Sequence, residues 1–204
     1  MCANKLSEHK RQQIIDAALI EFQLNGFKSS SMDAITRRAD VSKRTVYNHF
    51  PSKAELFISA VFYAHEQMHR VVNTVFNPDL DLRQQLETIA LQEIQILLSE
   101  ELLKFARMLL TELISNPQMT ELLESKRPSF EEKFDLWLKQ AIKHGEIRIE
   151  DFEMANHHFF GVLKSSVFWP TLLQGKKFSS SAIKSIAKST VTLFLNTYAV
   201  KPER

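Results

Sequence analysis

Residues that cap helices divide residues 7 to 53 into short amphipathic segments. The spacing of these caps constrains the fold more than any other feature of the sequence. Serines, which accept hydrogen bonds from free N–H groups, stand where helices would begin, and a glycine stands where the first would end. These residues are Ser7, Ser30, Ser31 and Ser42, with Gly26 at the end of the first helix. The expected helices cover about residues 8–25, 32–39 and 43–50, ahead of a longer fourth helix.

The rest of the sequence also indicates helices. Glycine is scarce, with four residues in 204, and few alternating patterns suggest strands. The expected helices lie at about residues 53–76, 82–98, 100–115, 118–144, 152–174 and 181–198. Pro128 is expected to kink or restart the fourth of these. We therefore expect an all-α fold, with a three-helix N-terminal unit that feeds a larger helical bundle.

The charge of the chain is unevenly distributed. Residues 1–53 hold nine Lys or Arg against five Asp or Glu, and the remainder holds seventeen against nineteen. A basic N-terminal segment followed by a mildly acidic remainder is a weak indication of a polyanion as partner.

Cysteine content and hydropathy indicate the compartment. Cys2 is the only cysteine, so an internal disulfide and a cysteine-based zinc site are excluded and a reducing compartment is expected. The start, "MCANKLSEHKRQQ", lacks the apolar core of a signal peptide. No apolar run approaches the ~18 residues typical of a membrane span. We expect a cytoplasmic protein with no membrane partner.

The helix expected at 43–50 has two different faces. At about 100° per residue, Val46 and Phe50 point toward the first two helices. Arg44, Tyr47 and Asn48 point roughly the other way. The flank and the start of the helix add Thr45, His49 and Lys43. The outward face therefore consists of hydrogen-bonding groups with a cation near the N-terminus.

A helix-turn-helix uses such a face to read the major groove of DNA with its second helix. Arg44 can donate two hydrogen bonds to guanine, and Asn48 can pair with an adenine edge. The start of the second helix, with Ser30 and Ser31, suits a phosphate. Other groups that suit phosphate oxygens belong to Tyr47, Thr45, His49 and Lys43. An ordinary solvated surface is the alternative that the pattern alone leaves open.

The order of residues in "IIDAALIEFQLNGFKSSSMDAITRRADVSKRTVYNHFPSKAELF" resembles the N-terminal domain of TetR-type (tetracycline-repressor) transcriptional regulators. The matching residues lie within about 8–57 and are Ala18, Phe22, Gly26, Phe27, Ser31, Ile35, Ala39, Val41, Ser42, Tyr47, His49, Phe50, Ser52, Lys53 and Leu56. Asp40 stands where the family usually has a turn glycine, and Asp tolerates a left-handed conformation. Arg44 stands where many members have a small residue, so we expect it to make a base contact that is particular to this protein.

The resemblance implies a DNA-binding domain over residues 7–67, with the helix-turn-helix at 31–50, and a helical effector-binding and dimerisation domain over 68–204. It also implies roles for single residues. Phosphate-holding positions are matched by Tyr47, His49 and Lys53, and further DNA-backbone contacts by Thr45 and Ser31. Positions that often read bases are matched by Lys43, Arg44 and Asn48. Core positions are matched by Val46, Phe50, Ile35 and Phe22.

For the larger half, the resemblance implies an effector cavity and a homodimer through the last two helices. Candidates to line an apolar pocket are His65, Phe105, Met108, Leu109, Phe134 and Trp137, although aromatic and Met residues at helical spacing are usually core. The dimer is expected through helices near 152–174 and 181–198, where Gly161, Ser165 and Ser166 would allow close helix approach. The alternative is that these two helices are buried against other helices of the same chain.

Residues 65–69, "HEQMH", match the zinc motif H-E-x-x-H of metalloproteases. The extended motif fails because Val72 stands where glycine is required. A catalytic zinc needs a third protein ligand, and Glu87 and Glu93 lie at plausible separations but beyond the helix break at "NPD". We expect no metal, no cofactor and no enzymatic activity. The sequence predicts a dimeric repressor that binds a palindromic operator in double-stranded DNA and is released by an apolar or amphipathic effector. A zinc-dependent hydrolase and a DNA-binding adaptor controlled by a protein partner are the alternatives.

Overall fold

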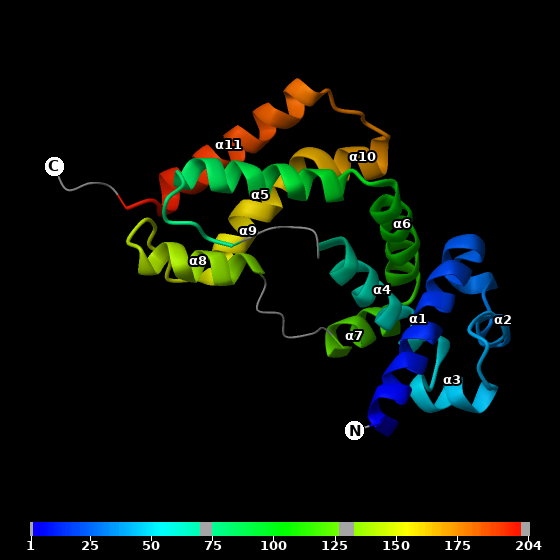
Figure 1. Ribbon diagram of the computed structural model, residues 1–204. Helices are drawn as coiled ribbons and strands as arrows, with labels where there is room; N and C mark the ends of the chain where they lie inside the picture. The colour runs from blue at the N-terminus through cyan, green and yellow to red at the C-terminus, as the bar shows by residue number, and fades with distance from the viewer. Residues whose placement is uncertain (1, 70–74, 127–132, 201–204) are drawn as a thin grey trace. The chain divides into compact units, whose positions relative to one another are not determined.

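The computed structural model describes residues 2–69, 75–126 and 133–200, and its named elements are all helices (Figure 1). The all-α prediction is confirmed. An isolated antiparallel bridge joins Ile147 to Ala199. The chain forms two compact units. The first contains α1 to α4, α7 and the part of α6 from Lys104 onward, and the second contains the other helices.

The first unit is built around α1. The helix α1 packs against α2, α3 and α4, and α7 packs against α4. The bounds are α1 (Cys2–Ser29), α2 (Met32–Arg38), α3 (Lys43–His49), α4 (Lys53–His69), α6 (Glu100–Ser115) and α7 (Pro117–Lys126). Its core joins Ile14, Phe22, Ile35, Val46 and Phe57, with Met119 from α7. The four core residues that the resemblance implied are all buried.

The helix α1 begins earlier than expected, and its regular part is broken at Gly26, where the first helix was expected to end. Gly26 has φ 73° and ψ 171°, a conformation outside the helical region, and one short turn follows it to Ser29. Only glycine adopts this backbone without strain, which explains why the residue stands here. Ser30 does not cap α2. It is buried, and its hydroxyl donates to the carbonyl oxygen of Glu21 at 3.1 Å.

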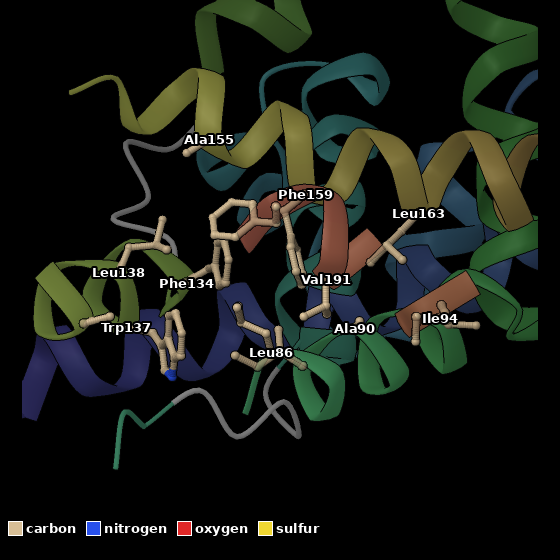
Figure 2. Packing of buried hydrophobic residues seen from close by; sticks show 14 of the residues in the cluster. Leu86, Ala90, Ile94, Phe134, Trp137, Leu138, Ala155, Phe159, Leu163 and Val191 are labelled. Atoms are coloured by element: carbon tan, nitrogen blue, oxygen red, sulfur yellow. The ribbon is translucent and has the colours of Figure 1, made fainter. Parts of the chain in front are cut away.

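The second unit packs α11 against α5 and α9, and a five-residue π-helical segment contacts α5. The bounds are α5 (Leu82–Leu97), α8 (Lys133–Lys143), α9 (Phe152–Leu163), η1 (Lys164–Phe168), α10 (Trp169–Gln174) and α11 (Ser180–Tyr198). Figure 2 shows Phe134, Phe159 and Val191 turned toward one another from α8, α9 and α11. The Phe134 and Phe159 rings are 4.8 Å apart.

Two expected helices are interrupted. The helix expected at 152–174 contains the π-helical segment just before Pro170, which has no N–H to donate to the preceding turn. The helix expected at 118–144 appears as α7 and α8, and Pro128 lies outside the described residues. The end of α4 near Phe76 also cannot be followed, because 70–74 are not described, but Val75 and Phe76 are not helical.

Candidate nucleic-acid interface

The helix α3 is a short helix fixed at both ends. Ser42 caps its start by accepting a hydrogen bond from the N–H of Thr45 at 3.1 Å. Asp40, in the turn before it, has φ 50°, the left-handed conformation that was expected of this residue. Phe50 ends the helix with an extended backbone, φ −138°, and its N–H donates to the carbonyl of Val46. The turn and the cap therefore set where the helix begins and which way it runs.

The two faces of α3 are those that the helical wheel predicted. Val46 and Phe50 are 0% and 3% exposed and belong to the core of the first unit. Tyr47 is 42% exposed, and Arg44 and Asn48 are exposed beside it. The exposed face of α3 is therefore rich in hydrogen-bond donors and acceptors. Its opposite, apolar face is packed into the core of the first unit.

Lys43 is held by an ion pair that sequence patterns did not reveal. Its ammonium lies 2.7 Å from a carboxylate oxygen of Asp33, in the first turn of α2, and the two side chains are 61% and 64% exposed. The hydrogen bond and the negative charge of Asp33 raise the pKa of Lys43 above its ordinary value. To make the expected base contact, the Lys43 ammonium would have to leave Asp33 or bind Asp33 and the base at the same time.

Ser31, Thr45 and His49 surround this face. Ser31 is exposed and caps α2, accepting from the N–H of Ala34 at 3.1 Å. Thr45 and His49 are half-buried on the flank of α3, and the Thr45 hydroxyl is 2.7 Å from that of Ser42. The start of α2 and the flank of α3 thus present hydroxyl and imidazole groups close to the exposed face. Their DNA contacts stay a prediction.

Lys53, expected to hold a phosphate, makes contacts within the chain. Its ammonium donates to the carbonyl oxygens of Phe27 at 2.8 Å, Lys28 at 3.3 Å and Ser30 at 2.9 Å. It also lies 4.6 Å from the centre of the Phe27 ring. The ammonium has three N–H groups, and three carbonyl oxygens surround it.

Two further residues that the sequence did not single out join α2 to α1. Glu21 on α1 is 6% exposed, and one of its oxygens lies 3.2 Å from the Arg38 guanidinium on α2. Its other oxygen accepts from Asn25 at 2.8 Å. An acidic residue on the inner side of an amphipathic helix was the available signal, because such a charge needs a partner.

The effector candidates fall into different places. Phe105 and Met108 of α6 line a cavity of about 260 Å³ in the first unit, whose other lining residues are Phe22, Gln23, Gly26, Lys104 and Arg107. Leu109 is half-buried against the same core, and His65 is exposed on α4. Phe134 and Trp137 are 2% and 1% exposed within the core of the second unit. Trp137 donates its indole N–H to Gln85 at 3.4 Å.

The zinc motif gains no support. His65 and Glu66 lie on the exposed surface of α4, and the side chain of His69 lies outside the described residues. Within the parts of the chain that the structure describes, no three His, Cys, Asp or Glu side chains gather as metal ligands would. Across residues 2–69, 75–126 and 133–200, none of the helices is both long and apolar enough to cross a membrane.

The segments expected to form the dimer are partly used inside the chain. Val191 and Phe194 of α11 are buried in the core of the second unit. Leu193 and Leu173 are 54% and 72% exposed, and Gly161 is exposed on α9. A dimer surface on these helices would use the exposed set. Its existence stays a prediction.

Comparison with known proteins assigns both parts of the chain. Residues 14–60 match the family model "Bacterial regulatory proteins, tetR family". Residues 84–200 match the model "AefR-like transcriptional repressor, C-terminal domain". The second match covers more than half of the chain, and the first covers α2 and α3 entirely.

Individual relatives match most of the chain. A TetR family transcriptional regulator from Pseudomonas syringae pv. tomato str. DC3000 is 32% identical with a TM-score of 0.69, over 94% of this chain and 97% of that one. The Flavonoid-responsive Regulator FrrA is 25% identical with a TM-score of 0.76, over 96% and 100%. The HTH-type transcriptional regulator SrpR of Pseudomonas putida is 25% identical, over 79% of this chain and 75% of SrpR.

Proposed function

The chain belongs to the TetR family of bacterial transcriptional regulators, and we propose that it is a dimeric repressor whose paired α3 helices read a palindromic operator and which a small molecule releases. It is a DNA-binding regulator with a helix-turn-helix formed by α2 and α3. The observation that carries the proposal is the exposed polar face of α3 over a buried apolar back.

On that face, Arg44 and Asn48 are the base-reading residues. A guanidinium matches the two acceptors on the major-groove edge of guanine, and an amide matches adenine. Tyr47, Thr45 and His49 then serve the phosphates on either side, together with the N–H groups at the start of α2 beside Ser31. Two copies of α3 would enter successive major grooves about 34–36 Å apart, which requires the operator to be an inverted repeat.

The cavity beside α1 is the site that we assign to the effector. Phe22, Phe105 and Met108 give it an apolar lining, to which Lys104 and Arg107 add two cations. This combination suits a planar or amphipathic organic molecule with a polar or anionic end. FrrA, which shares the fold, is described as responsive to flavonoids, which are planar molecules with hydroxyl groups. A bound ligand would contact α1, against which α2 and α3 pack. Through this contact it would shift the population toward a form of the protein that does not bind the operator.

The flavonoid naringenin, used with one variant in the cavity lining and one control variant outside it, tests this assignment. Gln23 is exposed and lines the cavity, whereas its neighbour Leu24 is exposed and does not. We expect naringenin to raise the thermal midpoint of the parent and of Leu24→Trp, and to release operator DNA from both. Gln23→Trp should lose both responses because the larger indole would occupy part of the cavity. Equal responses in all three proteins would place the effector elsewhere.

A further inference from the structure

Glu21 places a buried carboxylate in the contact between α1 and α2. It is 6% exposed, one of its oxygens lies 3.2 Å from the Arg38 guanidinium, and the other accepts a hydrogen bond from Asn25 at 2.8 Å. A buried ion pair is a poor source of stability, because apolar residues of similar volume often stabilise a protein equally well or better. The pair therefore needs another explanation than stability.

The contacts of Glu21 reach both ends of α2. Its backbone carbonyl accepts a hydrogen bond at 3.1 Å from the hydroxyl of Ser30, which is buried just before α2 begins. Its carboxylate binds Arg38, the last residue of α2. Because one residue of α1 holds the segment before α2 and also its last turn, it fixes the direction in which α2 lies across α1.

The apolar contacts between α1 and α2 do not fix this direction by themselves. Ala18 and Phe22 of α1 share a core with Ile35 of α2. Burial of apolar surface is non-directional, so it allows small rotations and shifts of one helix against the other. Hydrogen bonds to a carboxylate are directional, and only a narrow range of helix orientations satisfies them.

The turn after α2 carries its direction over to α3. The N–H of Asp40 donates to the carbonyl of Arg37 at 3.3 Å, and the N–H of Val41 donates to that of Thr36 at 3.4 Å. With the left-handed Asp40, these two bonds form a Schellman motif, which closes the end of a helix in a defined geometry. The helix α3 begins at Lys43, so the orientation of α2 also sets the orientation of α3.

We propose that Glu21 is a positioning residue for sequence recognition: together with Arg38 it sets the angle at which the exposed face of α3 meets the bases. This inference rests on the proposed function, since it concerns how that face is presented to DNA. Base contacts require hydrogen-bond geometry, whereas attraction to phosphates depends mainly on charge. Loss of the pair should therefore reduce the discrimination between operator and random DNA, and not the general attraction to DNA.

Glu21→Leu tests the inference, because leucine fills the buried position and removes the partner of Arg38. Affinities for random duplex DNA and for the operator that the parent selects would be measured by fluorescence anisotropy, well below each thermal midpoint. We expect the ratio of operator to random affinity to fall about tenfold, which corresponds to roughly one base contact. The affinity for random DNA should be kept or raised, since an acid is removed, and the thermal midpoint should be kept or raised.

Asp16→Leu is the matched control, since Asp16 is an exposed acid on α1 and its loss changes the net charge equally. Its ratio of affinities should equal that of the parent. A purely structural role of Glu21 would lower both affinities and the thermal midpoint at an unchanged ratio. An unchanged ratio in Glu21→Leu would therefore overturn the inference.

Arg38→Met provides the same test if Glu21→Leu does not fold, because the Arg38 side chain is 38% exposed and its loss leaves no large gap. It should lower the ratio in the same way, and Arg38→Lys, which can still pair with Glu21, should restore most of it. An unchanged ratio with a salt slope smaller by about one would make Arg38 a phosphate contact and overturn the inference. A parent protein without preference for any sequence would instead contradict the proposed function.

Discussion

At the scale of residues, the acidic partner of Lys43 changes what the interface offers to DNA. Asp33 and Lys43 neutralise each other at 2.7 Å in the absence of DNA, and both are more than half exposed. An exposed ion pair of this kind contributes little to stability, so its main effect is on the local potential. Asp33 weakens the attraction of this surface for any polyanion and leaves base-specific contacts to discriminate among sequences.

Replacing Asp33 by Asn should therefore strengthen binding to DNA of any sequence. Freeing Lys43 adds one cation to the surface, so the affinity for random duplex DNA should rise and the salt slope should steepen by up to about one. Anisotropy titrations at several salt concentrations measure both quantities. Glu150→Gln is the matched control, since it removes an acid from an exposed pair in the second unit. If Asp33→Asn and the control bind alike, Asp33 does not mask the interface.

Residue orientation was predictable wherever it follows from local geometry. The helical wheel placed Val46 inside and Tyr47 outside. The left-handed turn at Asp40 was implied by the family resemblance, which has a turn glycine there, and Asp tolerates that conformation. Contacts that join distant segments were not predictable. The carbonyl partners of Lys53 and the pair of Glu21 with Arg38 depend on how α1, α2 and α4 pack, and no periodicity encodes this.

At the scale of elements, the interface depends on a helix of seven residues that could not persist alone in water. Its start is held by Ser42 and its back by the core of the first unit. The boundaries of α3 were predicted almost to the residue because a cap, an apolar position and an aromatic end coincide. The π-helical segment that separates α9 from α10 was not predicted, because periodicity alone did not show how the helix would adjust before Pro170.

Removing the cap of α3 should weaken DNA binding specifically. Ser42→Ala leaves the N–H of Thr45 without its acceptor and should cost about 1 kcal/mol of stability. Because α3 is then less ordered, operator affinity should fall several-fold. Ser179→Ala removes an equivalent cap from α11 in the second unit. It should cost similar stability in denaturant titrations with no loss of operator affinity, and equal losses of affinity in both variants would contradict the account.

At the scale of the whole molecule, the sequence predicted two parts but not how the helices are shared between them. The boundary expected after residue 67 stays a prediction, and the structure groups α7 and most of α6 with α1 to α4. The reason is that an apolar stripe shows which face of a helix is buried without showing which partner buries it. Phe105 and Phe134 are both buried aromatic residues at helical spacing, yet they belong to different units.

The proposed dimer can be tested at Gly161. A Cβ placed on this residue would meet no atom within 4 Å in its own chain, so a larger side chain fits the single protomer. If a second copy of α9 approaches here, Gly161→Leu should shift the protein from dimer to monomer in sedimentation equilibrium. Gln140→Leu, on the exposed surface of α8, should remain dimeric. An unaltered dimer in Gly161→Leu would exclude this face as the interface.

The central claim is that the exposed face of α3 reads DNA sequence, and selection from a random duplex pool tests it most directly. The parent and Arg44→Ala would each be used, with Arg148→Ala, an exposed arginine in the second unit, as control. We expect the parent and the control to select the same inverted repeat. Arg44→Ala should select it with one position per half-site relaxed, at a cost of about 1–3 kcal/mol. Identical preferences in the parent and Arg44→Ala, or no sequence selected by the parent, would contradict the account.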